Sequence, residues 1–129
     1  MSDFLALAIE LQIEAYRQGD PSIASSIMTG PILEDLTNEI NSLNQQGLIS
    51  ISKIDYYQSY IHNIRVIDDT LLELDTCEVW TTNTHQQSNG KLINSQGPSL
   101  LPQTITIEQI DGNWFITTMD FLQASAFCS

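Results

Sequence analysis

The sequence has few positive charges. Four Lys and Arg residues stand against 16 Asp and Glu in 129 residues, so the formal net charge at pH 7 is −12. The four cations are scattered and cannot form the basic stripe that binding to a phosphate backbone requires, so we expect no direct nucleic-acid binding. They are Arg17, Lys53, Arg65 and Lys91. The acidic balance is typical of a soluble protein, and an acidic inhibitor or nucleic-acid mimic that binds a basic protein is an alternative.

Long apolar runs are also missing. No run reaches the roughly 18 residues of a membrane span, so we expect no membrane insertion. The N-terminal stretch MSDFLALAIELQIEAY has no basic start and contains Glu10 and Glu14 among its apolar residues, which predicts a helix and not a signal peptide. The chain as it stands is expected to be cytoplasmic, or exported if it is a domain cut from a longer protein.

Histidine, cysteine and glycine are too sparse to form a metal or phosphate site. His62 and His85 have no second ligand at helix or hairpin spacing, whereas a metal needs three or four convergent donors. No glycine-rich loop opens a helix. We therefore expect no metal and no cofactor. The redox state of Cys77 and Cys128 stays open: we expect two thiols in a cytosolic protein and a disulfide only in an oxidising compartment.

The N-terminal third of the chain is predicted to be helical. Apolar residues recur at helical spacing over 1–47, with breaks at 19–21 and 29–31 and a stop at Gly47, so we expect three helices. Hydrophobic residues make up 42% of the chain, enough for one core. At roughly 100–200 residues per domain, the length predicts a single domain over 1–129.

The rest of the chain, 48–129, has the composition of strands. Residues 54–67 are rich in Tyr and Ile, and a tight turn leads from them into a second strand over 70–82. Polar stretches at 85–90 and 95–98 predict loops.

A second hairpin joins strands 103–110 and 113–119 at the turn Asp111-Gly112. Three helices followed by two antiparallel hairpins predict an α+β domain. We expect the helices to pack on one face of a curved antiparallel sheet of about four strands.

Several short motifs resemble one superfamily. The first helix ends in Tyr-Arg-x-Gly-Asp at 16–20, and the last hairpin carries Asp-Gly-x-Trp-x-Ile at 111–116. With the order of helices and strands, these motifs resemble the nuclear-transport-factor-2-like (SnoaL-like) superfamily, whose cone-shaped domain is a cystatin-like half-barrel. Further motifs are similar to the intermembrane-space domain of plastid-division proteins and to related bacterial domains of unknown function. They are Thr29-Gly30, Gly47, Glu78-x-Trp80 and Asn89-Gly90.

The resemblance implies a pocket between helices and sheet. Alternation along strand 70–82 places Glu78 on its more apolar side, inside or at the lip of that pocket, where burial would raise its pKa. Glu78 is thus the best single candidate for function, although a buried Glu bonded to loop amides or to Arg65 would be purely structural. The expected lining residues are Tyr16, Leu36, Leu74, Glu78, Trp80, Trp114 and Ile116.

Two enzymatic alternatives follow from the same resemblance. An isomerase or cyclase would use Glu78, Tyr16 and Asp120 as acid, base and hydrogen-bond donor. An epoxide hydrolase of this fold would place Arg65 between two acids, for which Asp75 and Glu73 are candidates. A packed Tyr16 and an ordinary cross-strand ion pair explain these residues more simply.

The aromatic residues indicate assembly. Tyrosines at 56, 57 and 60 occupy both faces of one strand, and the chain ends in an apolar segment. We expect Tyr57, Ile61 and Phe127 to form an interface with another protein or with a second copy in a homodimer. The predicted function is a non-catalytic binding or scaffolding module, acting through the acidic, aromatic sheet face or through the pocket, which would take a small apolar ligand.

Overall fold

The computed structural model describes residues 2–122, apart from the side chains of Ser2 and of residues 56–60. Three helical segments are followed by four strands, in the order that the sequence predicts. They are α1 (Ser2–Gln18), the 3-10 helix η1 (Pro21–Ser26), α2 (Pro31–Gln45), β1 (Leu48–Asp68), β2 (Leu71–Gln86), β3 (Leu92–Ile110) and β4 (Asn113–Phe121).

Local signals set the helix boundaries. The Asp20 carboxylate accepts a hydrogen bond from the backbone N–H of Ser22, at 3.0 Å, and so caps η1 ahead of Pro21. Gly30 has a φ of +68° and precedes the first residue of α2. The middle helix is a single short 3-10 segment, because the breaks on both sides leave it only six residues.

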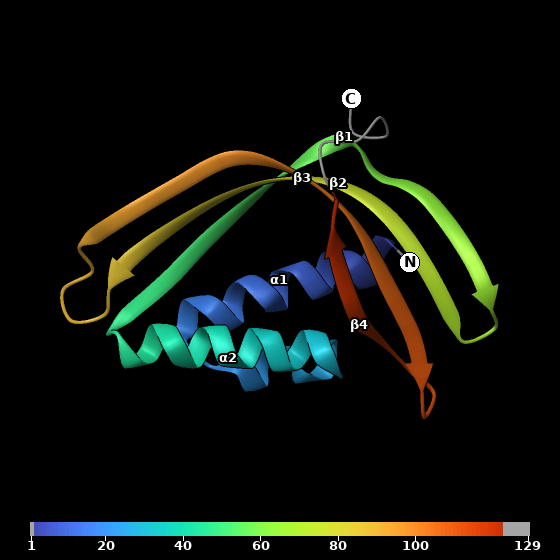
Figure 1. Ribbon diagram of the computed structural model, residues 1–129, viewed down its shortest axis with the longest axis horizontal. Coiled ribbons are helices and arrows are strands. Elements are labelled where there is room, and N and C mark those ends of the chain that lie inside the picture. The colour runs from blue at the N-terminus through green and yellow to red at the C-terminus, as the bar shows by residue number, and fades with distance from the viewer. Residues whose placement is uncertain (1, 123–129) are drawn as a thin grey trace.

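The strands form one antiparallel sheet in the order β1-β2-β3-β4. The sheet is strongly arched, and α1 and α2 lie under its concave side (Figure 1). We call this side the inner face and the convex side the outer face. The predicted α+β class, with helices on one face of a curved four-stranded sheet, is confirmed.

The loop predicted at 95–98 is wrong, because these residues belong to β3. Pairing with β2 continues across them, with a register shift between the pairs Trp80↔Ser99 and Thr82↔Gln96. Such a bulge absorbs extra residues without ending the strand. Gly97 sits in it with a φ of +96°, and a Cβ there would collide with the carbonyl oxygen of Trp80. Each of the four strands also extends beyond its predicted limits at one end or both, so that both hairpins are longer than expected.

The hydrophobic core fills the space between the helices and the inner face. Backbone hydrogen bonds join the two layers: Ile116 N–H donates to the Ile27 carbonyl at 2.8 Å, and Thr29 N–H donates to the Ile116 carbonyl at 3.1 Å. The core side chains are Leu5, Ala8, Ala15, Ala24, Ile27, Met28, Leu36, Ile40, Leu74, Ile105, Ile107 and Ile116. No helix in the described part of the chain is long and apolar enough to cross a membrane.

Candidate functional site

A pocket of about 420 Å³ lies between the helices and the inner face of the sheet. This volume falls within the range of small-molecule sites, roughly 300–1,000 Å³. Helices α1 and α2 provide one wall through Gln12, Ile13, Tyr16 and Glu39. The four strands provide the other through Ser50, Ser52, Trp80, Thr82, Gln96, Leu101, Gln103, Met119 and Phe121.

Glu78 lies beneath this lining and is completely buried. The Thr76 hydroxyl donates to its Oε2 at 2.8 Å, and the Trp80 indole N–H donates to its Oε1 at 3.1 Å. The amide nitrogen of Gln103 also donates to Oε2. Residues 76, 78 and 80 share a face because side chains alternate along a strand. Gln103 joins them because it is paired with Thr76 across the β2–β3 ladder.

Burial raises the pKa of the Glu78 carboxyl, and the hydrogen bonds from Gln103, Thr76 and Trp80 oppose that shift. Among the described residues no Lys or Arg forms an ion pair with it. Glu78 therefore lies where alternation in the strand predicts, held by three neutral donors. Its role in function stays a prediction.

Gln103 connects this carboxyl to the pocket. Gln103 is 1% exposed and lines the pocket, and its Nε2 donates a hydrogen bond to Glu78. Its Oε1 is buried and has no hydrogen-bond partner among the described residues. A buried acceptor left unpaired costs roughly 1–3 kcal/mol. The sequence analysis missed Gln103, although it is the polar member of the inward series Gln103, Ile105 and Ile107.

Tyr16 and Glu39 close the helical wall. The Tyr16 hydroxyl donates to Glu39 Oε2 at 2.8 Å and so joins α1 to α2. Burial, together with the carboxylate of Glu39, raises the pKa of Tyr16. Tyr16 thus lines the pocket as predicted from the resemblance. It is a neutral phenol whose hydroxyl already donates a hydrogen bond to Glu39. The sequence analysis did not single out Glu39.

No family model and no curated protein matches the chain. Among solved structures, the intermembrane space region of the chloroplast protein ARC6 matches with a TM-score of 0.73 and 12% identity, over 95% of this chain and 93% of that one. A nuclear transport factor 2-like superfamily protein from Salmonella enterica serovar Typhimurium matches with 0.58 and 10%, over 95% and 92%. The chain has the nuclear-transport-factor-2-like fold.

A third structure agrees with this assignment. An NTF-2 like protein of unknown function from Shewanella oneidensis matches with a TM-score of 0.54 and 15% identity, over 93% of this chain and 97% of that one. The resemblance predicted from the short motifs is thereby confirmed for the fold. Identities this low carry the fold alone, since this fold hosts unrelated functions on one scaffold.

Most of the apolar residues expected in the pocket of this fold lie elsewhere. Leu36, Leu74 and Ile116 belong to the buried core, and Trp114 packs against it. These side chains fill part of the space between helices and sheet, so the lining of the remaining pocket is more polar than predicted. Trp80 does line it.

The structure does not bring Asp120 to the pocket. Asp120 is paired with Thr104 on β3, and Thr104 with Asp75 on β2. Because directly paired residues share a face, all three lie on the outer face, away from Glu78. A register shift between Thr106 and Ile107 reverses the alternation in β4 after Ile116. The predicted set Glu78, Tyr16 and Asp120 is therefore not assembled.

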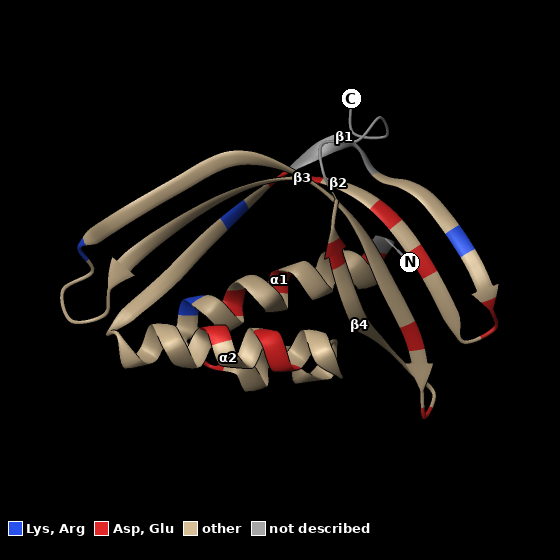
Figure 2. Cartoon of the chain, viewed as in Figure 1, with Lys and Arg blue, Asp and Glu red and all other residues tan. Residues whose placement is uncertain are grey.

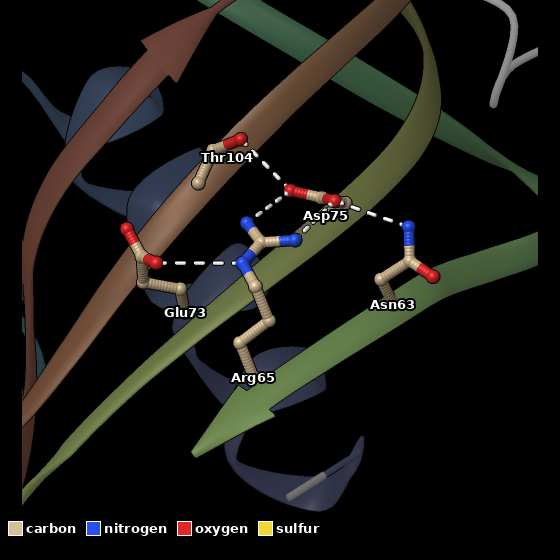
Figure 3. A network of polar contacts seen from close by, with 5 residues as sticks. All are labelled: Asn63, Arg65, Glu73, Asp75 and Thr104. Carbon is tan, nitrogen blue, oxygen red and sulfur yellow. Dashed lines mark hydrogen bonds and ion pairs between the residues drawn. The ribbon is translucent and has the colours of Figure 1, made fainter. Parts of the chain in front are cut away.

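The outer face carries an ion-pair network (Figure 3). Arg65 Nη1 and Nη2 donate to the two Asp75 carboxylate oxygens at 2.7 and 2.8 Å, and Arg65 Nε donates to Glu73 at 3.4 Å. Asn63 and Thr104 donate to Asp75 at 3.1 and 2.9 Å. Arg65 thus lies with both predicted acids, but the network lies outside the pocket. The alternative that Arg65 bonds to Glu78 is wrong, since the two lie on opposite faces.

The remaining predictions concern an interface, a disulfide and the absence of a metal site. Ile61 is partly buried and packs against the core. The side chains of Tyr57, Phe127 and Cys128 lie outside the described residues, so the interface and the disulfide stay predictions. Cys77 is buried. Within the described part of the chain, no cluster of His, Cys, Asp and Glu has the geometry of a metal site.

Proposed function

We propose that this chain is a non-catalytic binding domain that holds a small ligand in the pocket between its helices and its sheet. One observation carries this proposal: a pocket of about 420 Å³, within the volume range of small-molecule sites, lies between the helices and the inner face of the sheet. The fold is compatible with ligand binding and with scaffolding, and this pocket favours the former.

The same contacts argue against catalysis. Both oxygens of Glu78 already accept hydrogen bonds, and the residue lies behind Trp80 and Gln103 instead of facing the pocket. A general base must reach the proton that it removes, directly or through one water. Tyr16 is engaged with Glu39. The groups that could transfer a proton are therefore already engaged within the protein, which argues against proton transfer.

Two alternatives that use the surface, nucleic-acid mimicry and scaffolding through the outer face of the sheet, receive less support. Nucleic-acid mimicry requires acids gathered on one face, whereas Asp and Glu lie on both helices as well as on the sheet (Figure 2). On the outer face, Arg65 pairs with Glu73 and Asp75, so these charges already interact with each other. The pocket is thus the better candidate for the binding site.

A fragment screen by ¹H–¹⁵N NMR tests the proposal. Trp80 lines the pocket, whereas Trp114 packs against the core, so the two indole N–H signals separate pocket binding from effects elsewhere. We expect fragments to shift the Trp80 signal and to leave that of Trp114 nearly unchanged.

Two matched variants control this screen. Ser52 lines the pocket, and the neighbouring Lys53 is exposed on the opposite side of β1. Ser52→Phe should fill the pocket and abolish the Trp80 shifts, whereas Lys53→Phe should preserve them, with circular dichroism confirming that both variants fold. Absence of any pocket ligand, or fragments that bind equally to the Ser52→Phe variant, would refute the proposal.

A further inference from the structure

The pocket has the charge character of a cation site. Among its described lining residues there is one carboxylate, Glu39, and no Lys, Arg or His. The chain as a whole carries a formal charge of −12. An anionic ligand would therefore meet no compensating charge among the described lining residues, whereas a cation would meet a favourable field.

Several hydrogen-bond donors of the lining are used within the protein. The Tyr16 hydroxyl donates to Glu39, and the hydroxyls of Ser52 and Thr82 lie 3.2 Å apart and bond to each other. The Trp80 indole and the Gln103 amide nitrogen donate to Glu78.

One charged acceptor remains available for a ligand, the carboxylate of Glu39. A carboxylate accepts up to about four hydrogen bonds, so Glu39 keeps capacity beyond the one from Tyr16. The pocket therefore matches a ligand that donates hydrogen bonds.

Aromatic side chains complete this arrangement. Tyr16, Trp80 and Phe121 line the same pocket. Aromatic rings attract cations near their faces and also pack well against an apolar ligand body.

We propose that the pocket binds a protonated organic amine, whose ammonium group donates to the Glu39 carboxylate. Its apolar body packs against the aromatic lining. This inference rests on the proposed function, and it adds the chemical class of the ligand. An ammonium group suits the site because it carries three donors and no acceptor.

Three probes of one skeleton test this class: phenethylamine, 2-phenylethanol and 3-phenylpropanoate. Each is titrated into the protein while the Trp80 indole signal is followed. We expect the amine to bind about tenfold more tightly than the alcohol, since a hydrogen bond to a charged donor is stronger than one to a neutral donor. We expect the carboxylate to bind most weakly.

A matched pair of variants on α2 tests the role of Glu39. Glu39→Gln removes the charge in the pocket, and Glu34→Gln removes an exposed charge in the first turn of the same helix, outside the lining. Glu39→Gln should weaken the amine roughly two- to fivefold, as expected for a partly solvated ion pair. It should leave the alcohol unchanged. Glu34→Gln should affect neither probe.

The outcomes separate this inference from the function on which it rests. If the alcohol or the carboxylate binds as tightly as the amine, and Ser52→Phe abolishes that binding, the pocket binds ligands but the amine class is wrong. Equal weakening by Glu39→Gln and Glu34→Gln would also overturn the class. If no probe and no fragment occupies the pocket, both proposals fail.

Discussion

Replacing Arg65 by Met probes how the outer face holds a buried charge. Asp75 has a side chain only 9% exposed, and Arg65 supplies two of its four side-chain hydrogen bonds. Met preserves much of the apolar stem of Arg65 and removes the guanidinium. The variant therefore leaves a buried carboxylate with only the neutral donors Asn63 and Thr104 (Figure 3).

The expected loss follows from the unequal exposure of the pair. Removing one partner of a fully buried ion pair costs about 3–5 kcal/mol. The Arg65 side chain is 43% exposed, so solvent already weakens the pair, and we reduce the expected loss to about 2 kcal/mol. Arg17→Met is the matched control. It changes the net charge equally but breaks only an exposed pair with Glu14, and we expect little effect.

The pKa of Asp75 determines how the stability loss of the Arg65→Met variant changes with pH. The Arg65 guanidinium holds the pKa of Asp75 well below its usual range, with help from Thr104 and Asn63. A lowered pKa stabilises the fold above the unfolded value of about 3.9, and that stability is lost as the pH falls through the folded value. Without Arg65 the buried Asp75 carboxyl protonates more readily. The free energy of unfolding that the Arg65→Met variant loses should therefore become smaller as the pH falls from about 7 to about 4.5.

Urea unfolding followed by tryptophan fluorescence measures both effects. A loss no greater than that of Arg17→Met would show that the network contributes nothing beyond charge. A deficit that stays constant over the same pH range would show that Asp75 is not the group left without its partner.

Three further predictions use the same unfolding assay. Burial raises the pKa of Glu78 above 4.5, so stability should fall as the pH rises from that value through the raised one, and Glu78→Gln should remove this fall. Gly97→Ala should cost about 2 kcal/mol or more, because its Cβ meets the Trp80 carbonyl, whereas Gly90→Ala has open space and should cost about 1 kcal/mol. Ile105→Ala in the core should cost about 2–5 kcal/mol, against less than about 0.5 kcal/mol for the exposed Ile67→Ala. Equal losses within either matched pair, or an unchanged pH slope in Glu78→Gln, would contradict these expectations.

The features predicted correctly are those that neighbouring residues determine. The helix breaks around Asp20 and Gly30 are set by capping and by backbone conformation, and the structure confirms both. Alternation within β2 places Glu78 on the inner face, where it is buried. The order of helices and hairpins was enough to predict the fold class.

The errors arise where pairing between distant strands decides the outcome. Gly97 and Pro98 are local turn signals, but pairing with β2 carries β3 through them. Simple alternation in β4 places Asp120 on the face of Ile116, whereas the bulge opposite Thr106 turns it outward. A bulge position depends on two strands together, so one strand's sequence does not specify it.

A cluster of three buried polar side chains beneath the pocket bears on the choice between a structural and a functional role for these residues. Thr76, Glu78 and Gln103 are fully or almost fully buried next to an apolar core, where well-packed apolar residues are often at least as stable as buried charges. A cluster that served stability alone would satisfy each of its polar atoms, because the cost of an orphaned acceptor exceeds the gain from a typical hydrogen bond. Here the unpartnered atom, Gln103 Oε1, belongs to the one member of the three that also lines the pocket. The imperfection of the cluster therefore lies in the residue that borders the pocket, which connects these buried polar side chains to the pocket and not only to the stability of the core.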